Sequence, residues 1–270
     1  MEVKRLLMYI FALFNCLYIF TIGYFFRKNR KLISNMCELF NYQRVKEVMN
    51  PELKAIIPGI DAAGLVRDDA PVELRGLHWT DGNVSAEELI LIAKLARRYK
   101  PNRLFEIGTF DGRTTLNLAC NSSPDAMVYT LDLPDKNRSV KKPATLNGDM
   151  SFVNKVAIGS RFHGTDCENR ITQLYGDSAT FDFSPYENKM DLVFIDGAHT
   201  YEYILNDSEK ALRLLRDGHG IILWHDYKWV WDDVRRALNK LYLTRSEFKD
   251  LRQIKDTSLV CLVNYRTERR

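Results

Sequence analysis

From Arg103 onward, short apolar runs alternate with helical patterns along the chain. Almost every position within each run is apolar, which is typical of strands that are buried on both faces of a parallel sheet. The predicted strands are Arg103–Ile107, Met127–Leu131, Ile171–Tyr175, Asp191–Ile195 and Gly220–Trp224. The alternation predicts an α/β fold, a doubly wound and mostly parallel sheet with helices on both faces.

Helical periodicity lies before and between these runs. Ser85 and Glu88 form an S-x-x-E pattern, which is typical of a helix N-terminus. Near the C-terminus, Leu251–Ile254 and Leu259–Tyr265 are separated by a short polar turn and predict an antiparallel hairpin that closes one sheet edge. The helices predicted between the strands are Arg113–Cys120, Tyr201–Leu215 and Val230–Leu241.

A different apolar run stands near the N-terminus. Leu6–Phe26 contains no charged residue, and about 20 such residues are needed to cross a bilayer as a helix. A cleaved signal peptide is the alternative, but the run is long for one and no small-x-small cleavage site follows it. We therefore predict a membrane anchor over residues 1–31. Basic residues after the run predict a single-pass protein with its remaining domain in the cytoplasm.

Charge and cysteine content narrow the function classes. The formal net charge is +4, but six of the 39 basic residues and one of the 35 acidic residues lie in residues 1–31. The rest of the chain carries 33 basic against 34 acidic residues, which gives no support to nucleic-acid binding. The five cysteines are scattered and lack C-x-x-C spacing, which favours reduced thiols over a disulfide framework or zinc site.

The stretch FEIGTFDGRTT begins at Phe105, where the first predicted strand turns into a helix. Gly108 permits a sharp backbone turn, and Gly112 permits the start of the helix to approach a ligand closely. The spacing is G-x-x-x-G, which is neither the dinucleotide pattern nor the Walker pattern. A tight strand-to-helix turn without a ligand is the alternative interpretation.

Acidic residues stand on or just after three successive strands. Glu106 lies within the first strand, where it favours a cationic ligand over a pyrophosphate. Asp132 ends the second strand and can accept hydrogen bonds from two ribose hydroxyls, and Asp177 follows the third and can accept one from an adenine amine. Because these strand ends meet at one sheet edge, the three acids suit an adenosine that carries a cationic amino acid.

On these residues the sequence resembles the class I S-adenosylmethionine-dependent methyltransferases, which have a Rossmann-like fold. The E-I-G-T-x-x-G-x-T-T run is similar to that of the catechol-type and antibiotic-sugar O-methyltransferases, and the resemblance covers about residues 82–265. Phe110 stands where many methyltransferases have glycine. The resemblance implies S-adenosylmethionine contacts at Glu106, Gly108, Gly112, Asp132 and Asp177.

Chemistry at the next two strand ends is predicted from Asp196, His199, His225 and Asp226. In the sugar O-methyltransferases that the chain resembles, a D-x-x-H places a metal-ligating Asp beside a basic His, and two acids after the fifth strand complete the site. His199 is therefore the candidate general base, with a loop histidine as the alternative. Asp196, Asp226 and His225 are candidate ligands of Mg²⁺ or Mn²⁺. His225 replaces the first expected acid, so it favours Mn²⁺ or Fe²⁺ over Mg²⁺, or packs without any metal.

The chain is thus predicted as an anchor (residues 1–31), a connector (32–80) and a methyltransferase-like domain (81–270). The predicted function is O-methylation of a hydroxyl on a sugar, glycolipid or small metabolite. The alternative is a non-catalytic, membrane-anchored module that binds S-adenosylmethionine or a partner. Aminopropyl transfer is disfavoured, because no paired-acid amine channel is evident. The polar insertion Pro134–Arg170 is predicted to be a lid or specificity loop.

Overall fold

The computed structural model describes residues 2–26, 29, 47–48, 50–66, 71–134, 157–228 and 230–265. The chain divides into two compact units, Met1–Lys54 and Ala55–Arg270. The first unit contains helix α1 and two short 3₁₀ turns, η1 and η3. The bounds of these elements are Glu2–Phe20 for α1, Gly23–Phe25 for η1 and Pro51–Leu53 for η3.

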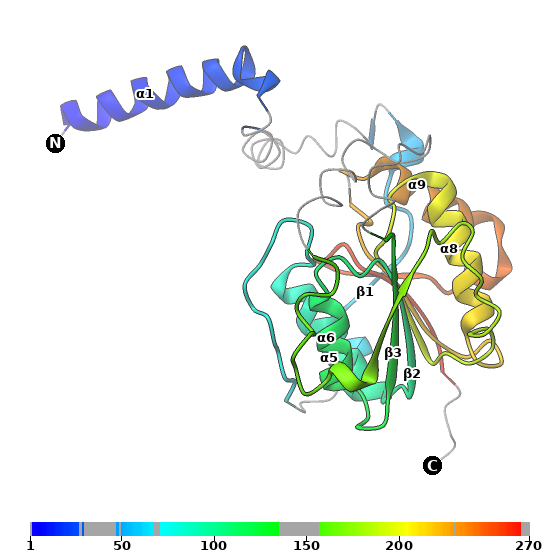
Figure 1. The fold of residues 1–270 in the computed structure, drawn as a ribbon. Coiled ribbons are helices and arrows are strands. Elements are labelled where there is room, and N and C mark those ends of the chain that lie inside the picture. Colours follow the sequence, from blue (N-terminus) through cyan, green and yellow to red (C-terminus); the bar gives the residue numbers. More distant parts are fainter. Residues whose placement is uncertain are drawn as a thin grey trace. The chain divides into compact units, whose positions relative to one another are not determined.

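The second unit is built on one eight-stranded sheet (Figure 1). Its order is β1-β7-β8-β6-β5-β2-β3-β4, and every neighbouring pair is parallel except the two pairs that β8 makes. This is the mostly parallel sheet that the sequence predicts. The strands are β1 (Gly59–Ile60), β2 (Arg103–Ile107), β3 (Met127–Asp132), β4 (Ile171–Tyr175), β5 (Leu192–Ile195), β6 (Gly220–Trp224), β7 (Arg252–Ile254) and β8 (Val260–Asn264).

Helices cover both faces of the sheet, with α5 and α6 on one side and α8 and α9 on the other (Figure 1). Neighbouring residues of β2 point to opposite faces, so Leu104 joins the buried cluster under α5 and α6, whereas Phe105 joins the one under α8 and α9. The doubly wound prediction is therefore confirmed. The helices are α4 (Ala62–Leu65), α5 (Ala86–Tyr99), α6 (Arg113–Asn121), α8 (Tyr201–Leu214) and α9 (Asp232–Thr244), and 3₁₀ turns η5 (Glu168–Arg170) and η6 (Ser246–Phe248) complete the unit.

The predicted hairpin exists as β7 and β8, but it does not form the sheet edge. β8 lies between β6 and β7, and the two-residue strand β1 pairs outside β7 in parallel. β1 and α4 come from the predicted connector, and both belong to the second compact unit. The edge prediction was wrong because β1 is too short to leave an apolar pattern, and its pairing with β7 joins residues far apart in sequence.

Helix α1 is shorter than the predicted transmembrane segment. It has 19 residues, ends at Phe20 and carries Glu2, Lys4 and Arg5 in its first turn, so only part of it is free of charge. Within the described part of the chain, no helix combines the length and apolar composition that crossing a membrane requires. The structure therefore does not support the predicted transmembrane helix.

The predicted insertion Pro134–Arg170 is described only from residue 157 onward, and residues 135–156 lie outside the described part. The segment from residue 157 packs on the turn after β2. Gly159 N donates to Phe110 O at 3.0 Å, and Arg161 N donates to Asp111 O at 2.9 Å. This end of the insertion is therefore a fixed neighbour of the glycine turn.

We expect the second unit, Ala55–Arg270, to fold without the first, because contacts concentrate within each unit. The truncated protein should show one cooperative thermal transition close to that of the full chain, measured by circular dichroism.

Removing residues 1–66 is the matched control. This larger deletion takes away β1 and the buried side chains Ile57 and Leu65, each worth about 1.5–3 kcal/mol of burial. It should lower the melting temperature clearly. A protein that begins at Ala55 and fails to fold would contradict the division after Lys54.

Candidate active site

The predicted site residues lie on or just after neighbouring strands at one edge of the sheet. β2 lies between β3 on one side and β5 on the other, so the chain order reverses beside it. Parallel α/β sheets bind ligands at this point, beyond the carboxyl ends of the strands. The acids after β3 and β4 therefore flank one side of the glycine turn, and the residues after β5 and β6 flank the other.

Gly108 is required by a close approach between two backbones. It has φ +102°, and a Cβ there would lie 2.1 Å from the carbonyl oxygen of Asp196. Any side chain would force the turn after β2 away from the turn after β5. Phe110 also has a positive φ, +50°. Glycine adopts this conformation more easily than other residues. The turn therefore keeps the backbone of the G-x-G pattern although Phe110 replaces the glycine.

Gly112 is the N-cap residue of α6, has φ +82° and lies against another segment of the chain. A Cβ at this position would lie 2.6 Å from Phe162 and 2.9 Å from Gly159. Gly112 thus makes room for the 157–162 segment, and its predicted contact with the cofactor stays a prediction. Beside it lies Asp111, a buried carboxylate that was not predicted as a site residue and that accepts from Asn83, the Arg113 amide and Arg161 at 2.9–3.0 Å.

Glu106 is fully buried between β2, β3 and α6. Its Oε2 accepts hydrogen bonds from the hydroxyls of Thr115 and Thr130, whereas no described residue donates to its buried Oε1. Burial raises the pKa of this carboxyl to about 8, although both threonines act in the opposite direction. A cationic group brought to Oε1 would satisfy it and restore the charged form, which fits the ammonium that the resemblance implies.

Asp132 and Asp177 take up different surroundings at their strand ends. Asp132 Oδ2 accepts from the amide of Phe110 at 2.8 Å, so its carboxylate lies directly against the glycine turn. Asp177 Oδ1 accepts from the amide of Ala179 at 3.1 Å and from the hydroxyl of Tyr203 at 2.9 Å. Asp132 is thus part of the turn, whereas Asp177 is held in the neighbouring loop by α8.

The structure brings Asp196, His199, His225 and Asp226 together. Asp226 Oδ2 lies 2.8 Å from His199 Nε2 and 3.3 Å from His225 Nδ1. His225 Nδ1 also lies 2.9 Å from Asp196 Oδ1. The ring of His199 stacks on that of Trp231, with centroids 4.1 Å apart. All four residues predicted for the base and the metal are therefore in contact, as one cluster beyond β5 and β6.

Two members of this cluster were not predicted as site residues. Glu88 was recognised only as a helix cap, and its Oε2 also lies 3.3 Å from His225 Nε2. Lys228 places its Nζ 2.8 Å from Asp226 Oδ1. For Lys228 the available signal was its position two residues after Asp226. No local signal could connect Glu88 with His225.

Burial and charge act against one another within the cluster. Burial alone would lower the pKa of His225, but Asp196 and Asp226 hold the pKa of this imidazole well above its ordinary value. Burial opposes the charge of Asp226, yet His225 and His199 hold the pKa of its carboxyl well below the usual range. The pKa of Glu88 is also lowered, because bonds from His225 and Ser258 outweigh burial. The cluster is therefore a set of paired charges in which Glu88, His225 and Asp226 are buried.

The predicted metal ligands lie close enough for one ion, with donor atoms of Asp196, His225 and Asp226 within 4.8 Å of one another. Their donor atoms are nevertheless already engaged by the chain. His225 turns Nδ1 to Asp196 and Nε2 to Glu88. A ring nitrogen that donates a hydrogen has no lone pair for a metal. As arranged, these residues do not fit a divalent ion.

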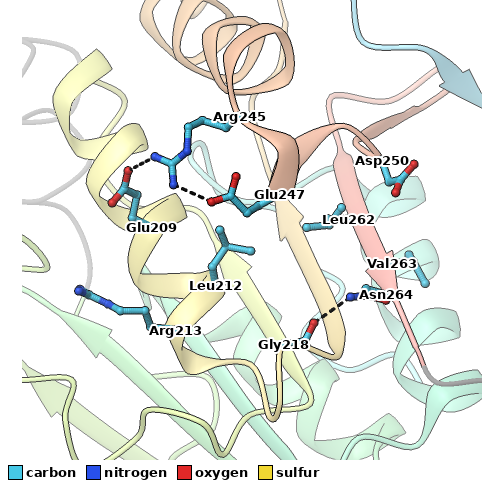
Figure 2. A pocket seen from close by; sticks show the side chains of 10 residues that line it. All are labelled: Glu209, Leu212, Arg213, Gly218, Arg245, Glu247, Asp250, Leu262, Val263 and Asn264. Carbon is cyan, nitrogen blue, oxygen red and sulfur yellow. Dashed lines mark hydrogen bonds and ion pairs between the residues drawn. The ribbon is translucent and has the colours of Figure 1, made fainter.

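A pocket of about 560 Å³ lies away from these residues (Figure 2). Its wall includes Gly218, which precedes β6, so it lies at the opposite end of that strand from His225. In the wall of this pocket, Arg245 forms ion pairs with Glu209 at 2.7 Å and with Glu247 at 2.9 Å. The pocket is therefore a surface hollow with paired charges in its wall, and none of the predicted site residues lines it.

Comparison with known proteins supports the family suggested by the sequence. A family model described as a methyltransferase domain matches residues 105–227. An uncharacterised protein of Acanthamoeba polyphaga mimivirus is 24% identical over 160 residues, which cover 56% of this chain and 65% of that protein. The match thus spans slightly less than two thirds of that relative.

Solved structures of methyltransferases are also similar at a low level. The O-methyltransferase TomG from Streptomyces achromogenes has a TM-score of 0.48 and 20% identity, covering 77% of this chain and 92% of its own. The Podospora anserina methyltransferase PaMTH1 has a TM-score of 0.49 and 18% identity, covering 84% and 97%. These similarities are too weak to carry an argument about activity.

The family match begins with β2 and ends just after β6. It includes the glycine turn, the acids at the strand ends and the histidines of the cluster, and it omits Glu88 and Lys228. Residues 105–227 therefore match a methyltransferase domain, which agrees with the resemblance of the sequence to the class I S-adenosylmethionine-dependent methyltransferases.

Proposed function

We propose that this chain transfers a methyl group from S-adenosylmethionine to a hydroxyl oxygen of a sugar, a glycolipid or another small metabolite. The observation that carries the proposal is the contact of His199 with Asp226, beside the glycine turn. The bound cofactor supplies a methyl group on a positively charged sulfur. The protein must hold the acceptor in line with that methyl group and remove the hydroxyl proton.

On the cofactor side, the turn after β2 offers the required surfaces. Gly108 keeps the backbone clear of side chains, Glu106 presents a buried oxygen without a donor among the described residues, and Asp132 lies against the turn. We assign Glu106 to the ammonium and Asp132 to the ribose hydroxyls. Asp177 is assigned to the adenine amine, because it follows the next strand, β4.

His199 is assigned as the general base. Asp226 is ionised and can only accept, so His199 Nε2 must carry the hydrogen of the bond that joins the two side chains. In the neutral ring the lone pair is then on Nδ1, which can take a proton. Stacking on Trp231 fixes the plane of the ring. Asp226 therefore orients the base and stabilises it once it is charged, as an acid does in other His-Asp pairs.

The mechanism assigns no step to a metal, because the donor atoms of the predicted ligands are engaged with one another. A non-catalytic module that binds S-adenosylmethionine remains the alternative function, and a labelling assay separates the two. The cytoplasmic location predicted from the basic residues near the N-terminus stays a prediction.

The test is to incubate the full chain with methyl-labelled S-adenosylmethionine and a panel of sugars, glycolipids and phenolic or aliphatic alcohols. Label should enter an acceptor as an ether methyl, which survives mild alkali, whereas a methyl ester would be hydrolysed. Binding of the cofactor without transfer to any fraction of a cell metabolite extract would favour the non-catalytic module.

We expect Asp132→Ala to weaken S-adenosylmethionine binding by about 1.5–3 kcal/mol, the scale for losing hydrogen bonds to a charged group. Isothermal titration calorimetry measures the change, and the melting temperature shows whether the variant is folded. Asp125→Ala, at an exposed turn, is the matched control and should bind as the unaltered protein does. Unchanged affinity in folded Asp132→Ala would remove Asp132 from the cofactor site.

Binding should also depend on pH through Glu106. Its pKa of about 8 means that the carboxyl is mostly protonated at neutral and mildly acidic pH. A cationic ligand favours the carboxylate, so binding should release a proton below this pKa. The dissociation constant should fall as the pH rises toward the pKa, by at most about tenfold per pH unit, and then level off.

Calorimetry in buffers of different ionisation enthalpy measures the released proton directly. Glu106→Gln keeps the shape of the side chain but cannot titrate, so it should lose this part of the pH dependence. An equal pH dependence in both proteins would show that Glu106 does not meet the ammonium.

His199→Ala should lower kcat by about 10²–10⁴, the usual range for general acid–base catalysis, with cofactor affinity nearly intact. Steady-state kinetics with an acceptor found in the panel measures this change. His219→Ala is the control, because His219 lies at the opposite end of β6. If His199→Ala leaves kcat unchanged, the assignment of the base is wrong.

A further inference from the structure

We propose that the cationic side chains of His225 and Lys228 occupy the place of a divalent metal at the ends of β5 and β6, with Glu88 as the counter-ion that holds His225 there. This inference deepens the proposed function and rests on it, because it names the charges that fix the base and the acceptor side of the same site.

The position of His225 indicates that its side chain is a cation. Its ring is almost completely buried and lies between two carboxylates, with Nδ1 2.9 Å from Asp196 Oδ1 and Nε2 3.3 Å from Glu88 Oε2. A carboxylate accepts hydrogen bonds and does not donate them, so both ring nitrogens act as donors. A ring with two N–H groups is a cation. It brings a positive charge to Asp196 and Asp226, the two carboxylates that were predicted to hold a metal.

Hydrogen bonds from the chain hold the carboxylate of Glu88 in place as the counter-ion of His225. Its Oε1 accepts from the amide of Ser258 at 2.8 Å and from its hydroxyl at 2.7 Å, and Oε2 accepts from the Ser85 amide at 2.9 Å. Three donors from two distant segments therefore set the orientation of the carboxylate before His225 is considered. Buried charges are retained when they are paired and hydrogen-bonded in this way.

Lys228 lies on the more open side of the cluster and pairs with Asp226. Its Nζ lies 2.8 Å from Asp226 Oδ1, while Oδ2 of the same carboxylate meets His199 at 2.8 Å. An ion bound to Asp226 would have to displace the ammonium or lie beside a like charge. Magnesium also demands octahedral coordination, mostly by oxygens. Side chains of the protein instead lie against both Asp226 oxygens.

The charges also balance as the proposal requires. Glu88, Asp196 and Asp226 contribute three negative charges, and His225 with Lys228 contributes two positive charges. His199 can gain the third positive charge when it accepts the proton from the acceptor hydroxyl. His225, Glu88 and Lys228 are therefore positioning residues for the base.

The test is a titration of the full chain with Mn²⁺, followed by the electron paramagnetic resonance signal of the free ion. The unaltered protein should leave that signal unchanged at equimolar concentration. The double variant His225→Asp/Lys228→Ala restores the paired acids of the enzymes that the sequence resembles and removes both internal cations, so it should bind one Mn²⁺ per chain. His219→Asp, the same change at the opposite end of β6, should bind none.

Two results would overturn the proposal. One is binding of Mn²⁺ by the unaltered protein that is lost in Asp196→Asn, and this measurement does not depend on any variant of His225. The other is a folded His225→Asp/Lys228→Ala protein that binds no Mn²⁺. Neither readout requires methyl transfer, so a failure of the proposed function would be distinguishable from a failure of this inference.

Discussion

The backbone contact between the turns after β2 and β5 fixes the geometry of the whole site. Gly108 lies so close to the Asp196 carbonyl that no side chain fits between them, and Asp196 N donates to Ile107 O at 2.8 Å. On the other side, Gly108 N donates to Leu131 O at 2.9 Å. Three strand ends are thereby joined through main-chain atoms. The distance between the glycine turn and the cluster beyond β5 and β6 is therefore set by the backbone, and side-chain motion cannot change it.

Within that frame, electrostatics decides which side chains can be buried together. Three carboxylates in a small buried volume repel one another unless each meets a donor. Asp226 also has φ +63°. This is an uncommon backbone conformation that Asp tolerates better than most residues. Strained backbone and paired buried charges commonly occur together at functional sites, where surrounding structure supports them. The cluster orients its side chains more than it stabilises the fold. Losing one partner would leave a buried charge without its counter-charge.

The sequence predicted those parts of the fold that leave a local pattern. β2, β4 and β6 were predicted with their observed bounds, because each is a short run in which most residues are apolar and turn residues limit it. β1 has two residues and depends on β7, which no local pattern encodes. At the site, the sequence alone shows that His225 stands where the first of the two expected acids would be. Its partner Glu88 was recognised only as a helix cap, because the fold alone brings α5 beside the end of β6.

Phe110 explains why the end of the insertion is part of the site. Its positive φ places it in the left-handed region. An L-residue there costs roughly 1–2 kcal/mol relative to the right-handed conformation, and glycine would avoid this cost. Phe110 is held there by two bonds, since its amide donates to Asp132 and its carbonyl accepts from Gly159. Gly112 in turn leaves room for Phe162. The 157–162 segment therefore supports a turn that glycine would form unaided, so a change in this segment would act on the glycine turn, and on the cofactor binding proposed there, through the backbone of Phe110.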